Sequence, residues 1–310
     1  MSMMRRAALA LLLAGAAAIP AHAAEGRLPV VATFSILGDV VQQVGGERIA
    51  LTTLVGPDGD AHVFEPGPAD ARALAEARVL VVNGLGFEGW MERLEQAAGF
   101  SGTRVVASDG VVPRAMADDT HDETHAATDH DHDHGALDPH AWQDVANVQL
   151  YVRNIAAALA AADPEGAAEY RSDAEAYLAA LAALDREVRS TIAAVPVDRR
   201  TIVTSHDAFG YFAAAYGLTF LAPEGISTES EPSAADVAAL IRQVREDRVQ
   251  AVFVENITDV RMLEQIGRET GARIGGTLYS DALSPPDGPA ATYIDMMRHN
   301  IRTLADALQS

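Results

Sequence analysis

The segment that most restricts the fold is an alanine-rich stretch near the middle of the chain, "PEGAAEYRSDAEAYLAALAALDREVRSTIAAVP", residues 164–196. It starts with a proline in a first-turn position and stops before Pro196, a pattern that predicts one long helix. At 1.5 Å per residue this helix would be roughly 45 Å long, which is more than one small domain needs. We therefore expect it to span two parts of the molecule.

Strand-like apolar runs alternate with helical stretches on both sides of this segment. The first half contains "LPVVATFSI", "RIALTTLVG", "ARVLVVNGLG" and "TRVVAS", with helices predicted at 68–77 and 87–98. The alternation restarts at "TIVTS" and ends in a helix through "YIDMMRHNIRTLADAL". This pattern predicts an α/β protein of two β/α lobes with central, mostly parallel sheets, joined by the long helix. The predicted parts are an N-terminal lobe (24–141), a helical segment (142–196) and a C-terminal lobe (197–310).

The first 23 residues have the features of a secretory signal peptide. Arg5 and Arg6 precede an apolar run, and Ala21-His22-Ala23 is a small-residue cleavage site. The run is shorter than the roughly 20 residues of a membrane-spanning helix, so we expect cleavage and a soluble periplasmic protein. The sequence has no cysteine, so we expect neither disulfides, nor thiolate ligands, nor a lipid anchor.

The formal net charge of −21 at pH 7 disfavours nucleic acids and anionic membrane surfaces as partners, because like charges repel. Cations are the natural partners of such a chain. Acidity also supports solubility, so the charge alone does not identify a ligand, and the choice depends on individual residues.

Four polar residues lie after strand-like runs or at a helix entry, where ligands bind in open α/β sheets. They are His62 after "LTTLVGPDGDA", His140 in "LDPHAW", His206 at the end of "TIVTSH" and Asp281 at the end of "GGTLYSD". Three imidazoles and one carboxylate suit tetrahedral zinc better than the oxygen shells of calcium or magnesium. A single histidine near a turn is more often a surface residue, so the prediction depends on all four positions, two from each half. We expect the metal site in the cleft between the lobes.

The segments around these residues resemble the solute-binding proteins of zinc ABC importers, the cluster A-I (cluster 9) family that includes ZnuA-type and AztC-type proteins. "DAHVFEP", "LDPHAWQD", "TSHDAFGYF" and "GTLYSDAL" are similar to the family's four ligand segments, and the resemblance covers essentially the whole chain after the signal. It implies high-affinity capture of Zn²⁺ in the periplasm and delivery to a membrane permease, without catalysis. Manganese-binding relatives place a glutamate at the position of His206, so this histidine implies zinc.

A second group of histidines lies in the stretch 110–136, which has no apolar period and is dense in Asp, Thr and His, as in a solvated loop. Its "DHDHDH" alternation has no pattern that would aim three imidazoles at one tetrahedron, whereas "LDPHAW" has a turn fixed by proline. We therefore expect a separate loop that binds zinc weakly, with a plain solvated linker as the alternative. The loop histidines are His121, His125, His130, His132 and His134.

Ligating imidazoles usually donate their other N–H to a carboxylate, and sequence neighbours suggest Glu65 for His62 and Asp207 for His206. Glu255 in "FVEN" follows a buried strand, and two roles are open to it, orienting a metal ligand or structural hydrogen bonding, of which we favour the structural one. Two other functions stay open: a secreted zinc hydrolase with Glu65 or Glu255 as general base, and a periplasmic zinc buffer or chaperone. We expect a monomer that meets an ABC permease, with a periplasmic zinc chaperone as a further candidate partner and no nucleic acid.

Overall fold

The computed structural model describes residues 26–115, 137–223, 225, 228–229 and 232–309. The predicted signal peptide and the five histidines of the predicted loop lie outside these ranges. Within them, no helix combines the length and the apolar character needed to cross a membrane.

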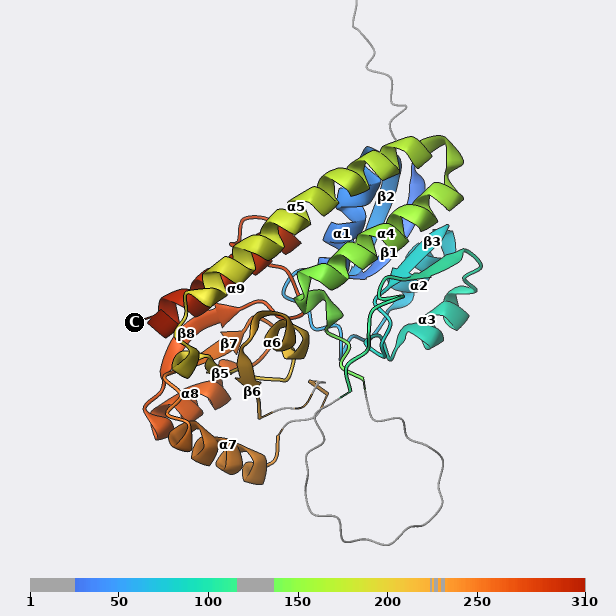
Figure 1. Ribbon diagram of the computed structural model, residues 1–310. Coiled ribbons are helices and arrows are strands. Elements are labelled where there is room, and N and C mark those ends of the chain that lie inside the picture. Colours follow the sequence, from blue (N-terminus) through green and yellow to red (C-terminus); the bar gives the residue numbers. More distant parts are fainter. Residues whose placement is uncertain (1–25, 116–136, 224, 226–227, 230–231, 310) are drawn as a thin grey trace, which may run out of the picture.

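The N-terminal lobe is built on a four-stranded parallel sheet of order β2-β1-β3-β4. Its strands are β1 (Leu28–Phe34), β2 (Ile49–Val55), β3 (Val79–Val82) and β4 (Thr103–Val106). Helix α1 (Ser35–Gly45) and helix α4 (Val145–Ala162) pack on one face, and α2 (Pro68–Glu76), with α3 (Met91–Ala98) beside it, packs on the other (Figure 1). Because both faces are covered, β1 and β3 are almost wholly buried and read as continuous apolar runs.

The C-terminal lobe repeats this arrangement with a parallel sheet of order β6-β5-β7-β8. Its strands are β5 (Thr201–Val203), β6 (Thr219–Leu221), β7 (Ala251–Glu255) and β8 (Arg273–Leu278). Its helices are α6 (Gly210–Tyr216), α7 (Ala234–Glu246), α8 (Val260–Thr270) and α9 (Tyr293–Gln309). In each lobe the first strand lies inside the sheet, between the second and the third strand.

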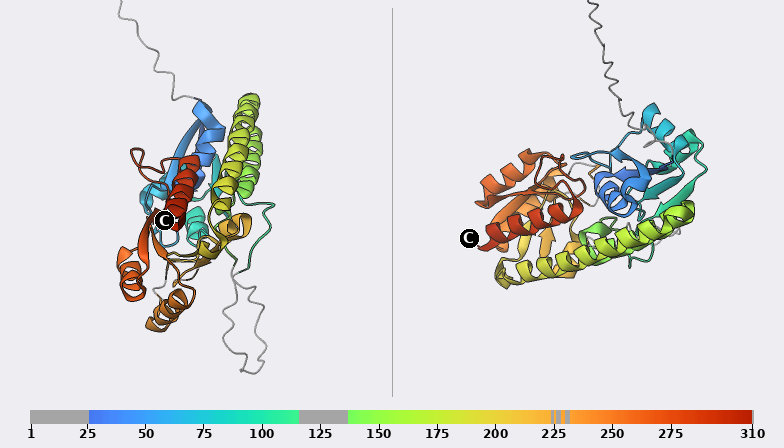
Figure 2. Two further views of the ribbon diagram at one scale, coloured as in Figure 1. Left: turned by 60° about the vertical axis from the view of Figure 1, so that its left-hand side comes forward. Right: turned by 90° about the horizontal axis from the view of Figure 1, so that it is seen from above.

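Helix α5 (Ala167–Ala193) runs along both lobes (Figures 1 and 2). It packs against α1 and α4 on the N-terminal side and against α6 and α9 on the C-terminal side. The prediction of two α/β lobes joined by a long helix is confirmed. The helix begins at Ala167 rather than Pro164, because Pro164–Gly166 form a 3-10 turn whose Gly166 N–H donates to the Asp163 side chain.

Buried side chains of the two lobes form a continuous core. Val31 from the N-terminal sheet, Leu181 and Leu184 from α5, and Phe253 and Leu278 from the C-terminal sheet belong to one contact cluster. Burying an aliphatic or aromatic side chain of this size contributes about 1.5–3 kcal/mol. A smaller cluster lies beneath α7 and α8, on the other face of the C-terminal sheet.

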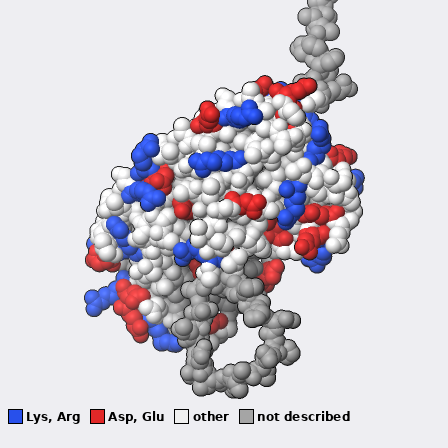
Figure 3. Space-filling view, turned by 45° about the vertical axis from the view of Figure 1, so that its right-hand side comes forward, with Lys and Arg blue, Asp and Glu red and all other residues white. Residues whose placement is uncertain are grey.

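On the face drawn in Figure 3, acidic and basic side chains lie side by side over the surface rather than in separate patches. The charge distribution on this face therefore does not indicate a ligand-binding surface.

Candidate metal centre

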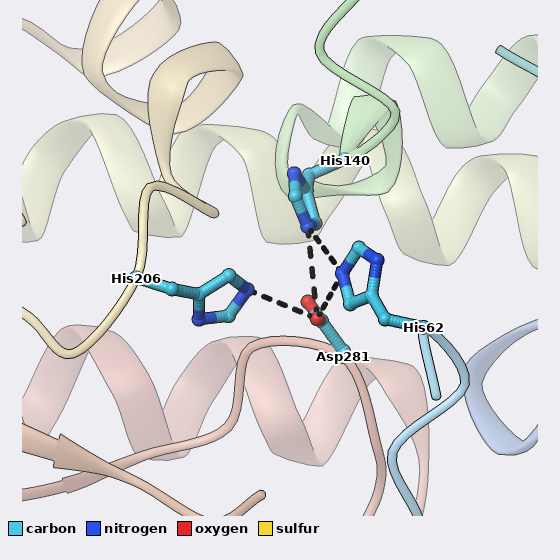
Figure 4. Close-up of side chains that lie close together, drawn as sticks. All are labelled: His62, His140, His206 and Asp281. Carbon is cyan, nitrogen blue, oxygen red and sulfur yellow. Dashed lines mark hydrogen bonds and ion pairs between the residues drawn. The ribbon is translucent and has the colours of Figure 1, made fainter. Parts of the chain in front are cut away.

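Four side chains from distant parts of the sequence converge at the seam between the lobes (Figure 4). His62 lies in the loop after β2, and His140 immediately precedes the 3-10 turn Ala141–Gln143 that leads into α4. His206 lies in the loop after β5, and Asp281 in the loop after β8. One ligand atom from each of the four lies within 4.8 Å of all the others. The structure thus brings together all four residues that the sequence singled out.

The shortest separations all involve Nε2 atoms and one carboxylate oxygen, Asp281 Oδ2. This oxygen lies 3.1 Å from His62 Nε2, 3.1 Å from His206 Nε2 and 3.6 Å from His140 Nε2. The Nε2 atoms of His62 and His140 are 3.3 Å apart. For comparison, zinc with bonds of about 2.0–2.1 Å would hold its tetrahedral ligands about 3.3–3.4 Å apart.

The cluster is sealed from solvent. His140, His206 and Asp281 are fully buried, and His62 is 8% exposed. Among the residues that the structure describes, the second carboxylate oxygen, Asp281 Oδ1, is buried without a hydrogen-bonding partner. A buried polar atom without a partner is costly, so a cation at this centre would offset part of that cost.

Behind His140, a carboxylate orients the ring. Asp138 Oδ1 lies 2.9 Å from His140 Nδ1 and accepts a hydrogen bond from the His140 backbone N–H at 2.9 Å. Because Nδ1 faces Asp138, Nε2 is directed toward the centre, which is the usual arrangement of a ligating imidazole.

Behind His206, the carboxylate is Glu255 at the end of β7. Its Oε1 accepts hydrogen bonds from the backbone N–H groups of Ser205 at 2.8 Å and His206 at 3.0 Å. Its Oε2 lies 2.8 Å from His206 Nδ1, which is ion-pair distance, although the two atoms are not aligned as a hydrogen bond. The structural role predicted for Glu255 is therefore incomplete, because its carboxylate contacts the imidazole directly.

The structure corrects the two carboxylates predicted to orient imidazoles from their position in the sequence. Glu65 is exposed and lies beside the groove between α2 and α3. The Asp207 carboxylate lies near enough to His206 to interact with it electrostatically. The Asp207 backbone N–H donates to the Gly225 carbonyl. The carboxylate beside the His206 ring is that of Glu255, and Asp138 orients His140, for which the sequence suggested no partner.

His62 is held differently from the other two histidines. Its backbone N–H donates to Asp60 Oδ1 at 2.9 Å, and its ring meets the edge of Phe87 with centroids 4.8 Å apart. Trp90 Nε1 donates to the carbonyl of the preceding residue, Ala61, at 2.8 Å. Packing and backbone contacts therefore position this ligand loop.

The three buried groups strongly influence one another's protonation. Burial alone would lower the pKa of His140, but the Asp281 and Asp138 carboxylates outweigh it and raise the pKa to about 9. Burial also opposes the charged form of His206, yet Glu255 and Asp281 hold its pKa well above the usual value. Burial would raise the pKa of Asp281, and the two imidazolium groups instead hold it well below its usual range. Protons thus stabilise the metal-free centre, and a cation must displace them.

Comparison with known proteins gives matches over most of the chain. A family model described as ZnuA, the periplasmic component A of a zinc-uptake complex, matches residues 30–307. The manganese-binding lipoprotein MntA of Halalkalibacterium halodurans is 35% identical over 282 residues, which cover 91% of this chain and 88% of that protein. The iron-binding protein YfeA of Yersinia pestis is 30% identical over 279 residues, which cover 90% of this chain and 86% of that protein.

Solved structures show the same fold. The periplasmic zinc-binding protein TroA from Treponema pallidum matches with a TM-score of 0.82 at 29% identity, covering 91% of this chain and 99% of that one. A manganese-bound variant of a periplasmic metal-binding protein from Candidatus Liberibacter asiaticus matches with a TM-score of 0.81 at 30% identity, covering 91% and 100%. Since these matches take in both lobes and the long helix, the chain belongs to the ZnuA family, the periplasmic metal-binding components of ABC importers.

Proposed function

We propose that this protein captures Zn²⁺ in the periplasm and delivers it to the membrane permease of an ABC importer. The observation that carries the proposal is the buried group of four donor atoms, one from each of His62, His140, His206 and Asp281. Four protein ligands complete a tetrahedral zinc shell and leave no open position for a catalytic water. Zn²⁺ is therefore cargo in this proposal.

The chemistry of the donors supports zinc among the metals that the relatives' names mention, which include manganese, iron and zinc. Three imidazole nitrogens and one carboxylate oxygen are a borderline-soft set, whereas manganese favours an oxygen-rich, octahedral shell. The separations of 3.1–3.6 Å around Asp281 Oδ2 are also close to the edges of a zinc tetrahedron.

A zinc hydrolase gains no support from the two carboxylates considered as its general base. Glu65 is exposed on the surface of the N-terminal lobe. Glu255 Oε1 accepts two backbone hydrogen bonds and its Oε2 lies against His206, so neither oxygen faces a free position beside the metal. The zinc-binding component of an importer remains the better explanation.

Isotopic zinc uptake in a strain that lacks this gene tests the proposal. We expect the deletion to lower accumulation of radioactive zinc at limiting concentration, and the wild-type gene on a plasmid to restore it. Uptake that the deletion leaves unchanged would favour a periplasmic zinc buffer, and a deletion that lowers manganese but not zinc uptake would contradict the proposed metal.

The predicted histidine-rich loop is proposed to bind additional zinc weakly, independently of the buried centre. Its two stems pair through an antiparallel bridge between Ala115 and Leu137. Deletion of residues 120–135 removes none of these stem residues, so we expect one tight zinc per chain to persist while the weaker zinc is lost. Metal stoichiometry by calorimetry measures both.

A full-length variant with alanine at the five loop histidines is the matched control, because it keeps the loop length. We expect it to reproduce the deletion. Loss of the tight zinc in either variant would mean that the loop is part of the centre.

A further inference from the structure

We propose that Gln143 is a positioning residue that fixes the distance between His140 and Asp281 across the two lobes and thereby favours zinc over a larger ion. The proposal rests on the zinc-binding function proposed above, since it assigns a source of selectivity to the same centre.

The contact concerned is a pair of hydrogen bonds to one carbonyl group. Gln143 Nε2 donates to the Ser280 carbonyl at 2.7 Å, and Trp142 Nε1 donates to the same oxygen at 2.9 Å. Trp142 and Gln143 directly follow Ala141, next to the ligand His140, while Ser280 directly precedes the ligand Asp281. One carbonyl therefore ties a ligand segment of the N-terminal lobe to a ligand segment of the C-terminal lobe.

Both ends of this link are further restrained by residues of α9 in the C-terminal lobe. On the far side, the Asn300 side chain on α9 pairs with the backbone of Tyr279, accepting from its N–H at 2.9 Å and donating to its carbonyl at 2.7 Å. On the near side, Tyr293 Oη, at the start of α9, donates to the Trp142 carbonyl at 2.8 Å, so this contact also crosses between the lobes. The short backbone stretch that carries Asp281 is thus restrained from two directions.

Only one end of the Gln143 side-chain amide is satisfied by hydrogen bonding. It is fully buried, and its Oε1 has no hydrogen-bonding partner in the part of the chain that the structure describes. Such an atom is unfavourable for folding, and an apolar side chain of the same shape would avoid it. The hydrogen bond from Gln143 to Ser280 is therefore better explained by the positioning of the metal centre than by a gain in the free energy of unfolding.

Trp142 makes a poorer test of this link than Gln143. Its ring packs against Phe34, Phe87 and His140, with centroids 4.8–5.3 Å apart, so replacing it would disturb the core as well as the hydrogen bond. Gln143 can be changed with less loss of packing.

The distance that the link controls is the longest of those around the carboxylate, 3.6 Å between His140 Nε2 and Asp281 Oδ2. If the two segments separate further, the centre becomes too wide for short zinc bonds, while a larger ion such as Mn²⁺ tolerates the change. Loss of the link should therefore weaken zinc more than manganese.

The test compares dissociation constants for Zn²⁺ and Mn²⁺ in wild type and Gln143→Met, which keeps the shape of the side chain but cannot donate. We expect zinc affinity to fall about tenfold, the size of one hydrogen bond, and manganese affinity to fall by a much smaller factor. Gln143→Leu, which is apolar and also cannot donate, should shift the ratio in the same direction if the first variant folds poorly.

Asn147→Ala is the matched control. It removes a side-chain hydrogen bond to the Ala141 carbonyl within the same segment, at 3.1 Å, but this bond does not cross between the lobes. We expect its zinc-to-manganese ratio to match wild type. An equal loss for both metals in the Gln143 variants, or no loss for either, would overturn the proposal.

Failure of this inference is distinguishable from failure of the proposed function. A wild-type protein that prefers manganese would contradict zinc capture, whereas the change in ratio between wild type and variant tests the link whichever metal is preferred.

Discussion

Replacing His206 with alanine should weaken zinc binding by about 10²–10³-fold. Four-ligand zinc sites bind with about 10–16 kcal/mol, so one ligand of four accounts for about 2.5–4 kcal/mol. The variant would also leave the buried Glu255 carboxylate without the imidazole that lies 2.8 Å away. Competition with a chromogenic zinc chelator measures the loss.

His299→Ala serves as the control for that experiment. This histidine lies on α9, where its Nε2 contacts the Thr277 carbonyl at 3.0 Å, outside the four-residue centre. Its removal should leave zinc affinity unchanged. Wild-type affinity in His206→Ala would remove this residue from the proposed ligand set.

The variant His206→Glu replaces the imidazole with a carboxylate instead of removing the ligand, so it tests the chemistry of this ligand rather than its presence. A carboxylate can bind through two oxygens and raises the coordination number available, which favours larger and harder ions. We expect the preference for zinc over manganese to narrow without necessarily reversing, since zinc stands above manganese in the Irving–Williams order. An unchanged ratio of the two dissociation constants would contradict this.

Zinc affinity should fall by at least about tenfold for each pH unit between pH 8 and pH 6. The metal-free protein carries protons on His140, whose pKa is raised to about 9, and on His206, whose pKa is well above its usual value. The pKa of His140 lies above this window, so zinc displaces its proton throughout the window, at a factor of about ten per pH unit, and the raised pKa of His206 makes the decline steeper. Asp281 stays ionised here because its pKa is held well below its usual range.

Competition titrations at several pH values test the slope. Calorimetry in buffers of different ionisation enthalpy counts the released protons independently. From the reference pKa of about 6.5 alone, the decline would begin only near neutral pH. The carboxylates around the rings raise the pH at which this decline begins. The dependence of zinc affinity on pH should therefore flatten only as the pH approaches about 9. An affinity that does not change between pH 6 and pH 8 would contradict imidazole ligation.

The residues of the four-residue centre could be found from the sequence because local patterns mark their positions. His206 and Asp281 follow strands β5 and β8, and the Asp-Pro-His turn before α4 presents His140. Asp138 could have been recognised by the same reasoning, since it lies within that turn and its carboxylate folds back onto the ring.

Other parts of the centre depend on which strands are neighbours, and no local pattern reveals that. Glu255 reaches His206 only because β5 and β7 lie side by side in the C-terminal sheet. Asp207 is adjacent in sequence, but the loop directs its backbone N–H to Gly225 instead. The helix expected from Phe87 begins only at Met91, after a turn in which Gly84, Leu85 and Gly86 take positive φ angles.

Helix α5 has a consequence for how the protein unfolds. It packs against helices of both lobes, and its buried side chains belong to a core that includes residues of both lobes. If either lobe unfolded, it would expose apolar side chains of α5 and of the core that both lobes share. The two lobes should therefore melt in one cooperative transition, and a cation held by residues from both would raise the melting temperature of the entire chain.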